Sequence, residues 1–290
     1  MSAVLDRITK HGRPYRDPLT SIKWTSVDSG LPWLPRSLLL GCELNSLFDD
    51  EEFLKLSRAE FTRLCAAGLW LEGLLIHRVT EAGLLSLEPV EARVMLQEVR
   101  EECGHSLMFL EMIDRAGDGI RPQLEGTSIL TSVAKKLKID SAEFWAMAYI
   151  GETVTDNFAT RALRLIHSQK ETVCPLAEEV LAFHHREEAR HIAAARQFLA
   201  RRLSGMSSQR RWLFSRTLQW LLNLFLDATM YPSAESLKRA GLSNPTSIAR
   251  LLKNDVTRKR LAAECARSAL SLVSRDGWLS VSCRATGGAK

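Results

Sequence analysis

Two stretches of sequence decide the fold: VREECGHSLMF at residues 99–109 and FHHREEARHIAAAR at residues 183–196. Each contains a glutamate followed three positions later by a histidine, Glu102 with His105 and Glu188 with His191. On a helix this spacing puts both side chains on one face, where they can share a ligand. One such pair is common by chance, but two pairs on separate helices are a strong signal for a metal centre.

Two further glutamates interrupt apolar helix faces. Glu72 lies in the most apolar segment of the chain, LWLEGLLI at residues 69–76, and Glu152 lies in WAMAYIGETVTDNFA at residues 145–159. Glutamates are almost never fully buried unless they are paired or bound to a metal. Asp156, one turn after Glu152 on the same face, is the alternative donor from this helix.

Two helices with one glutamate each and two helices with Glu-x-x-His form the ligand pattern of ferritin-like di-iron and di-manganese carboxylate proteins. Two divalent ions held close together need several anionic oxygen ligands to offset their charge, and carboxylates can bridge both ions. A neutral imidazole on each ion adds a ligand without adding charge. Burying four glutamates without cations would cost several kcal/mol each. The pattern therefore predicts a two-metal centre.

A third histidine lies on the fourth helix. His184 precedes Glu188 by four residues and His191 by seven, so the three form one stripe along the helix. We expect His184 to bind the same metal as His191. His185 points about 100 degrees away on an ideal helix, which favours a place at the surface or behind the ligands.

The periodicity of apolar residues predicts four long helices, at residues 58–82, 88–115, 142–168 and 176–203. Ser57 and Ser141 are the expected N-caps of the first and third, Pro175 fits the first turn of the fourth, and Gly205 ends it. A further amphipathic helix is expected at 208–230, with shorter helices near 127–138, 233–240, 246–252 and 256–274. The aromatic residues of the helix at 208–230 indicate a face that docks on the bundle or on a dimer partner.

The predicted fold is all-α: a ferritin-like four-helix bundle with a loop-rich N-terminal arm and additional C-terminal helices. We expect a single domain over residues 1–290, with the arm at 1–55, the metal-binding bundle at 56–205 and peripheral helices at 206–290. Four of the nine prolines fall in the first 50 residues, which indicates the arm.

Composition and charge exclude several classes of function. Hydrophobic residues make up 46% and charged residues 25% of the 290 positions, as in ordinary globular proteins. No apolar run approaches the ~18 residues of a membrane span, and no secretory signal precedes the arm, so we expect a cytoplasmic protein without a membrane partner. The net charge of +5 comes without a repeated basic motif, which argues against nucleic acid. The six cysteines form no CxxC pair, and we expect reduced thiols.

The sequence resembles the AurF-like di-iron arylamine N-oxygenases. The resemblance rests on LSRAEFTRLCAAGLWLEGLL at residues 56–75, on REECGHSLMF at 100–109 and on HHREEARHIAAAR at 184–196, and it extends over most of the chain. The extra histidine separates this family from ordinary ferritin-like proteins. The resemblance implies seven metal ligands, two of which (Glu102 and Glu188) bridge the metals: Glu72, Glu102, His105, Glu152, His184, Glu188 and His191.

The resemblance also implies a function. Two iron ions would use O2 and electrons from an external donor to oxygenate an aromatic amine at nitrogen, towards a hydroxylamine, nitroso or nitro product. A reductase and a second copy of the chain are the implied partners. Phe109 and Tyr149, each one turn from a ligand, are the candidates to face the substrate, but for each taken singly we favour the interpretation as a plain core aromatic. The alternatives are a di-iron hydroxylase or desaturase, a ferritin-like iron store, and hydrolysis at a two-metal site.

Overall fold

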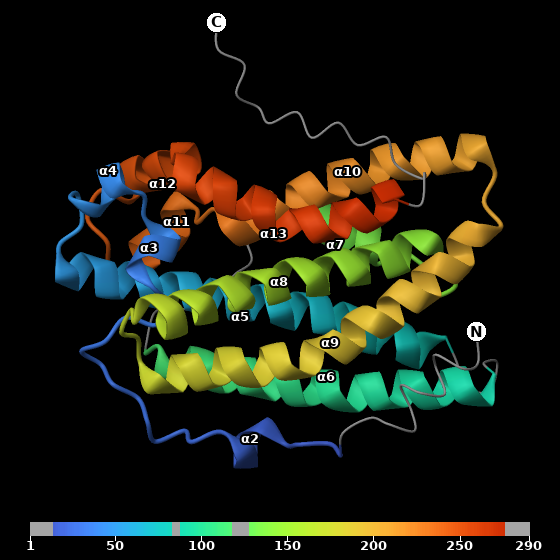
Figure 1. Ribbon diagram of the computed structural model, residues 1–290, viewed down its shortest axis with the longest axis horizontal. Helices are drawn as coiled ribbons and strands as arrows, with labels where there is room; N and C mark the ends of the chain where they lie inside the picture. Colours follow the sequence, from blue (N-terminus) through green and yellow to red (C-terminus); the bar gives the residue numbers. More distant parts are fainter. Residues whose placement is uncertain (1–13, 83–87, 118–127, 276–290) are drawn as a thin grey trace, which may run out of the picture.

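The computed structural model describes residues 14–82, 88–117 and 128–275, and every regular element within these ranges is a helix. Four long helices form the bundle: α5 (Asp50–Glu81), α6 (Pro89–Arg115), α8 (Ala142–Gln169) and α9 (Pro175–Ser204). Helices α5 and α6 pack as one antiparallel pair and α8 and α9 as the other, and the two pairs lie against each other (Figure 1). The chain therefore has the predicted all-α, ferritin-like fold.

The first bundle helix begins earlier than predicted. Helix α5 starts at Asp50, where the Asp49 side chain accepts a hydrogen bond from the backbone amide of Glu52 at 2.8 Å. Acidic residues fill the first turn, where they stabilise the positive end of the helix dipole. Ser57, the expected N-cap, is instead buried within the helix, and its hydroxyl accepts a hydrogen bond from the backbone amide of Trp33 at 2.8 Å. The prediction of Ser57 as the cap was wrong because that hydroxyl holds the N-terminal arm.

The other bundle helices begin and end close to the predicted positions. The Ser141 hydroxyl caps α8 by accepting from the Phe144 amide at 3.2 Å. Helix α9 begins at Pro175, whose missing N–H costs nothing in a first turn, and ends before Gly205. Helix α8 continues one residue past the prediction and closes on Lys170 in the left-handed conformation, with φ 56°.

The N-terminal arm wraps one end of the bundle and is less irregular than expected. From residue 14 onward it contains three one-turn helices, α2 (Pro18–Ser21), α3 (Arg36–Leu39) and α4 (Cys42–Asn45). Trp33 is fully buried and meets the Phe61 ring of α5 edge-on, with ring centroids 5.5 Å apart. The arm is therefore part of the hydrophobic core.

The remaining helices cover one side of the bundle (Figure 1). They are α7 (Ser128–Ala134), α10 (Ser208–Met230), α11 (Ala234–Arg239), α12 (Pro245–Asn254) and α13 (Val256–Arg275). Helix α13 packs along α8, and α10 contacts both α8 and α5. Helix α10 buries Phe214 and Phe225, whereas Trp212 and Trp220 are 63% and 46% exposed. The bundle thus takes up only part of the expected docking face.

The structure also bears on the expectations of reduced thiols and of no membrane-spanning helix. The described cysteines are free thiols, while Cys283 lies outside the described ranges. Across the same ranges, none of the helices combines the length and apolar character that a bilayer crossing requires. The division into arm, bundle and peripheral helices stays a prediction.

Candidate metal centre

The seven predicted ligands meet inside the bundle, and each is buried, with relative exposures between 0% and 8%. Helices α5 and α8 contribute one glutamate each, and α6 and α9 contribute the two Glu-x-x-His pairs together with the third histidine. Buried acids on the inner faces of four helices leave a small polar volume surrounded by hydrophobic core. The structure therefore brings these residues together from 120 positions of sequence.

Glu102 and Glu188 occupy the middle of the cluster. The Glu102 carboxylate oxygens lie 3.2 Å from His105 Nδ1 and 3.0 Å from His191 Nδ1. Glu188 Oε1 lies 3.0 Å from His184 Nε2, 3.5 Å from His105 Nδ1 and 3.7 Å from His191 Nδ1. Each of these two carboxylates contacts histidines from both sides of the centre, which is the position that a bridging ligand needs.

Glu72 lies at one side of the centre. Its Oε1 atom is 3.8 Å from both His105 Nδ1 and His184 Nε2, and its Oε2 atom accepts a hydrogen bond from the Ser106 hydroxyl at 2.7 Å. Two groups of three have ligand atoms within 4.8 Å of one another: Glu72 with His105 and His184, and Glu102 with His105 and His191. The cluster thus offers two adjacent places for a metal ion. His184 and His191 fall in different groups, which differs from the expectation that both bind the same metal.

Glu152, and not Asp156, faces the centre from α8. Glu152 is buried, and burial followed by the nearby Glu188 and Glu102 carboxylates raises its pKa well above the usual value. Asp156 lies one turn away and pairs with His185 Nδ1 at 2.5 Å. Cys103, within the first Glu-x-x-His pair, is exposed, as helical geometry predicts.

The pKa values of the clustered residues favour charged histidines beside charged carboxylates. Burial lowers the pKa of His105, but hydrogen bonds to Glu102 and Glu187 outweigh it and raise the pKa to about 10. Burial raises the pKa of Glu102, but His191 and His105 outweigh it and lower the pKa to about 2. Against burial, Glu188 raises the pKa of His184 to about 9. Protonated histidines thus compensate the buried carboxylates of the metal-free protein.

Buried polar atoms without hydrogen bonds test whether the residues fit a metal pair. Among the described residues, four carboxylate oxygens of the cluster accept no hydrogen bond: one of Glu72, one of Glu102 and both of Glu188. His191 Nδ1 also makes no hydrogen bond. Such atoms are costly to bury unless they have a partner. Carboxylate oxygens and imidazole nitrogens in this number are the donors that divalent iron or manganese prefers, so the residues fit.

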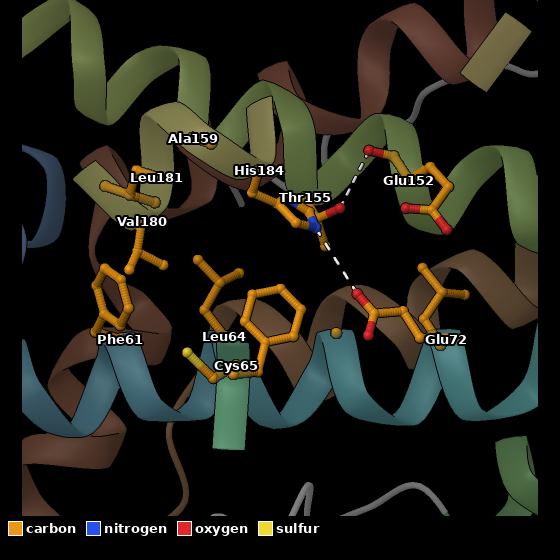
Figure 2. Close-up of a pocket in the computed structure, with 13 residues that line it drawn as sticks. Phe61, Leu64, Cys65, Glu72, Glu152, Thr155, Ala159, Val180, Leu181 and His184 are labelled. Carbon is orange, nitrogen blue, oxygen red and sulfur yellow. Dashed lines mark hydrogen bonds and ion pairs between the residues drawn. The ribbon is translucent and has the colours of Figure 1, made fainter. Parts of the chain in front are cut away.

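A small cavity adjoins the cluster (Figure 2). Glu72, Glu152 and His184 lie at one end, and Phe61, Val180 and Leu181 lie at the other. The other lining residues are Leu64, Cys65, Gly68, Leu71, Phe109, Thr155 and Ala159. The open space is about 20 Å³, room for little more than one water molecule.

Comparison with protein families gives a match over nearly the full chain. The family model described as "P-aminobenzoate N-oxygenase AurF" matches residues 5–277. The chain belongs to this family. No solved structure matches the chain.

Curated relatives of this AurF-family chain are known from mycobacteria. Uncharacterized proteins of Mycobacterium bovis and Mycobacterium tuberculosis are 34% identical over 141 residues, which is 46% of this chain. The matched stretch covers 39% of the length of these relatives. They share sequence with the chain and carry no assigned activity.

Two carboxylates that sequence reasoning missed support the histidines of this family member. His105 Nε2 lies 3.1 Å from Glu187 on α9, and His191 Nε2 lies 2.9 Å from Glu101 on α6. The signal was present: both stretches read Arg-Glu-Glu-x-x-His, at 100–105 and 186–191. In each, the second glutamate faces the centre, while the first holds the histidine of the opposite, antiparallel helix.

The two candidate substrate-facing aromatics differ in position. Phe109 lines the cavity and packs against the His184 ring, with centroids 5.0 Å apart. Tyr149 is buried but is not among the residues that line this cavity.

Proposed function

We propose that this chain is a di-iron oxygenase that transfers oxygen from O2 to the nitrogen of an aromatic amine. The observation that supports it most is the pair of Arg-Glu-Glu-x-x-His stretches on antiparallel helices. Together with Glu72, Glu152 and His184, these stretches bury a cluster of four glutamates and three histidines, and several of its atoms lack hydrogen bonds. Membership of the AurF family adds the reaction class. The proposed ligands are Glu72, Glu102, His105, Glu152, His184, Glu188 and His191, with Glu102 and Glu188 bridging.

Contacts on the outer side of His105 and His191 support one ring nitrogen of each as the proposed metal ligand. Glu187 and Glu101 engage Nε2 of His105 and His191, which leaves Nδ1 of both rings directed at the centre. His184 is oriented the other way, with Nε2 towards Glu188. A carboxylate behind a ligating imidazole sets its tautomer and makes it a stronger ligand. When bound, the iron pair supplies the O2 chemistry.

The apolar cavity positions the amine and limits water. Its metal-side end carries Glu72, Glu152 and His184, so an amine nitrogen entering there would point at the centre while its ring lies against apolar lining residues such as Leu71 and Phe109. An aromatic ring needs more room than about 20 Å³, so binding requires side chains to move. Leu64 is the half-buried residue of the lining and the first candidate for that movement.

Electrons must come from another molecule in this proposal. The sequence contains no glycine-rich dinucleotide or phosphate-binding motif. A separate reductase is therefore the proposed electron donor.

The test is oxygenation of a panel of aromatic amines, charged and neutral, by the iron-loaded and reduced protein under 18O2. The proposal expects a hydroxylamine, nitroso or nitro product that carries 18O on nitrogen, and no product from the metal-free protein. Oxygen on carbon would identify a hydroxylase instead. Ferric iron accumulating far beyond two ions per chain would indicate storage, and turnover without O2 would indicate hydrolysis; each would contradict the proposal.

A further inference from the structure

We propose that the substrate is an uncharged, apolar aryl amine that carries no carboxylate. This inference rests on the proposed function and narrows its substrate class. The inferred substrate differs from the p-aminobenzoate named in the family's description. That molecule has a carboxylate at the ring position opposite its amine.

Polar groups are confined to one end of the cavity. Glu72, Glu152 and His184 lie at the metal side, and the Thr155 hydroxyl there already donates to a backbone carbonyl of its own helix. If the amine nitrogen points at the metals, the opposite ring position lies among Phe61, Val180, Leu181 and Ala159. All four of these side chains are buried and none can donate a hydrogen bond to a carboxylate.

A buried carboxylate needs a cation or several donors, and the end of the cavity formed by Phe61, Val180 and Leu181 has neither. No lysine or arginine in the part of the chain that the structure describes lines the cavity. Arg63, on the same helix as Phe61 and Leu64, is turned away: its guanidinium pairs with Glu60 and donates to the Ala228 carbonyl at 3.0 Å. The titratable groups that line the cavity on the metal side are Glu72, Glu152 and His184, all of them proposed metal ligands, so none of them is left to pair with a carboxylate at the opposite end.

The thiol of Cys65 indicates the same preference for neutral groups. Cys65 lies in the cavity wall and is 1% exposed. Burial, followed by the Glu72 charge, raises the pKa of this thiol far above its ordinary value. The wall thus disfavours a negative charge on a group that belongs to the protein itself.

The test compares two ligands by calorimetric titration of the full chain, loaded with iron(II) and kept anaerobic. One ligand is p-aminobenzoate, and the other is 4-isopropylaniline, whose isopropyl group is neutral and similar in size to a carboxylate. We expect 4-isopropylaniline to bind at least about 100-fold more tightly, because its apolar end gains from burial while a carboxylate loses its hydration. Equal binding, preference for p-aminobenzoate, or binding of neither ligand would overturn the inference.

A variant adds the missing charge. Leu64 is half-buried in the cavity wall, so a lysine at this position can keep part of its length in water. Leu64→Lys is expected to raise the affinity for p-aminobenzoate at least about tenfold, while Leu64→Met is expected to keep the wild-type preference. An unchanged p-aminobenzoate affinity in a folded Leu64→Lys protein would contradict the inference. If Leu64→Lys does not fold, the wild-type comparison decides.

Adding O2 and a reductant to the same samples separates the two proposals. If 4-isopropylaniline binds but is not oxygenated by the reduced protein, the cavity assignment stands and N-oxygenation fails. If p-aminobenzoate binds at least as tightly and is oxygenated, N-oxygenation stands and the neutral-substrate inference fails.

Discussion

Two histidines of the centre, His105 and His191, have a carboxylate within 3.2 Å of each ring nitrogen. For His105 the inner partner is Glu102 and the outer partner is Glu187, and for His191 they are Glu102 and Glu101. Because the outer partners come from the opposite helix, α6 and α9 hold each other's ligands in place. This cross-connection makes the outer glutamates testable without touching a ligand.

We predict that Glu187→Gln weakens iron binding about 10- to 100-fold, because the amide no longer fixes the tautomer of His105 or strengthens it as a ligand. The measurement is the iron(II) affinity of the folded variant. Glu178→Gln is the matched control, since Glu178 lies on the same helix and pairs with His167 at 2.8 Å, away from the centre. Equal losses in both variants, or no loss in Glu187→Gln, would contradict the role given to Glu187.

Two adjacent histidines provide a second contrast. His184 is buried against Glu188, whereas His185 is partly exposed and pairs with Asp156. We predict that His184→Ala leaves a folded bundle with altered iron content and lost oxygenation, while His185→Ala retains both. Elemental analysis and turnover of the two variants make the comparison. The seven-ligand proposal fails if His184→Ala matches wild type in both.

At the scale of the helix, α5 must approach α6 closely where Phe109 packs over Gly68. A Cβ atom at Gly68 would collide with the Phe109 ring, while a Cβ at Gly73 on the same helix would meet nothing within 4 Å. Overpacking a core costs about 1–3 kcal/mol, and replacing a helical glycine by alanine gains about 0.5–1 kcal/mol.

We therefore predict that Gly68→Ala lowers the free energy of unfolding and that Gly73→Ala raises it. Denaturant unfolding of both variants measures the difference. If Gly68→Ala is at least as stable as Gly73→Ala, the Phe109 ring can move away from an added Cβ atom. That result would contradict close packing of α5 against α6 at Gly68.

Helix positions could largely be predicted, because long amphipathic segments with caps leave local signals. Ser141, Pro175 and Gly205 mark ends that the structure confirms. The start of α5 could not be predicted in the same way, since Asp49 and Ser57 are both acceptable caps. The choice between them depends on Trp33, whose amide uses the Ser57 hydroxyl, and a contact 24 residues apart has no local signature.

The centre could be predicted as far as residue type and spacing reach. Spacing places Glu102 with His105 and Glu188 with His191, and the structure brings both pairs together. Spacing does not show that Glu101 on α6 contacts His191 on α9, or that Glu187 on α9 contacts His105 on α6. These contacts depend on the antiparallel packing of the two helices. The cavity lining was also beyond prediction, since it combines residues of all four bundle helices.

At the scale of the whole molecule, the metal-free protein depends on protonated histidines. The pKa of His105 rises to about 10 and that of His184 to about 9 in the folded protein, from about 6.5 when unfolded. Groups with raised pKa stabilise the fold fully below pH 6.5, and the stabilisation is lost as pH rises through 9 to 10. We therefore predict that the metal-free protein loses unfolding free energy between pH 7 and pH 10, by roughly 1.4 kcal/mol per unit of pKa difference at most.

Iron-loaded protein is the control for this dependence. Metal-bound histidines are neutral at both pH values, so the loaded protein is expected to lose less stability over the same interval. Denaturant unfolding at pH 7 and pH 10 compares the two forms. A metal-free protein that gains stability at pH 10 would show that the histidines are not protonated at neutral pH.

The most direct test of the account is the number of iron ions that the chain holds. Metal-free protein would be titrated anaerobically with iron(II), and bound iron counted by elemental analysis, for wild type and for Glu188→Ala, which removes a proposed bridging ligand. The account predicts about two ions per chain in wild type and one or none in the variant. Wild type that binds no iron, or a variant that still binds two, would contradict it.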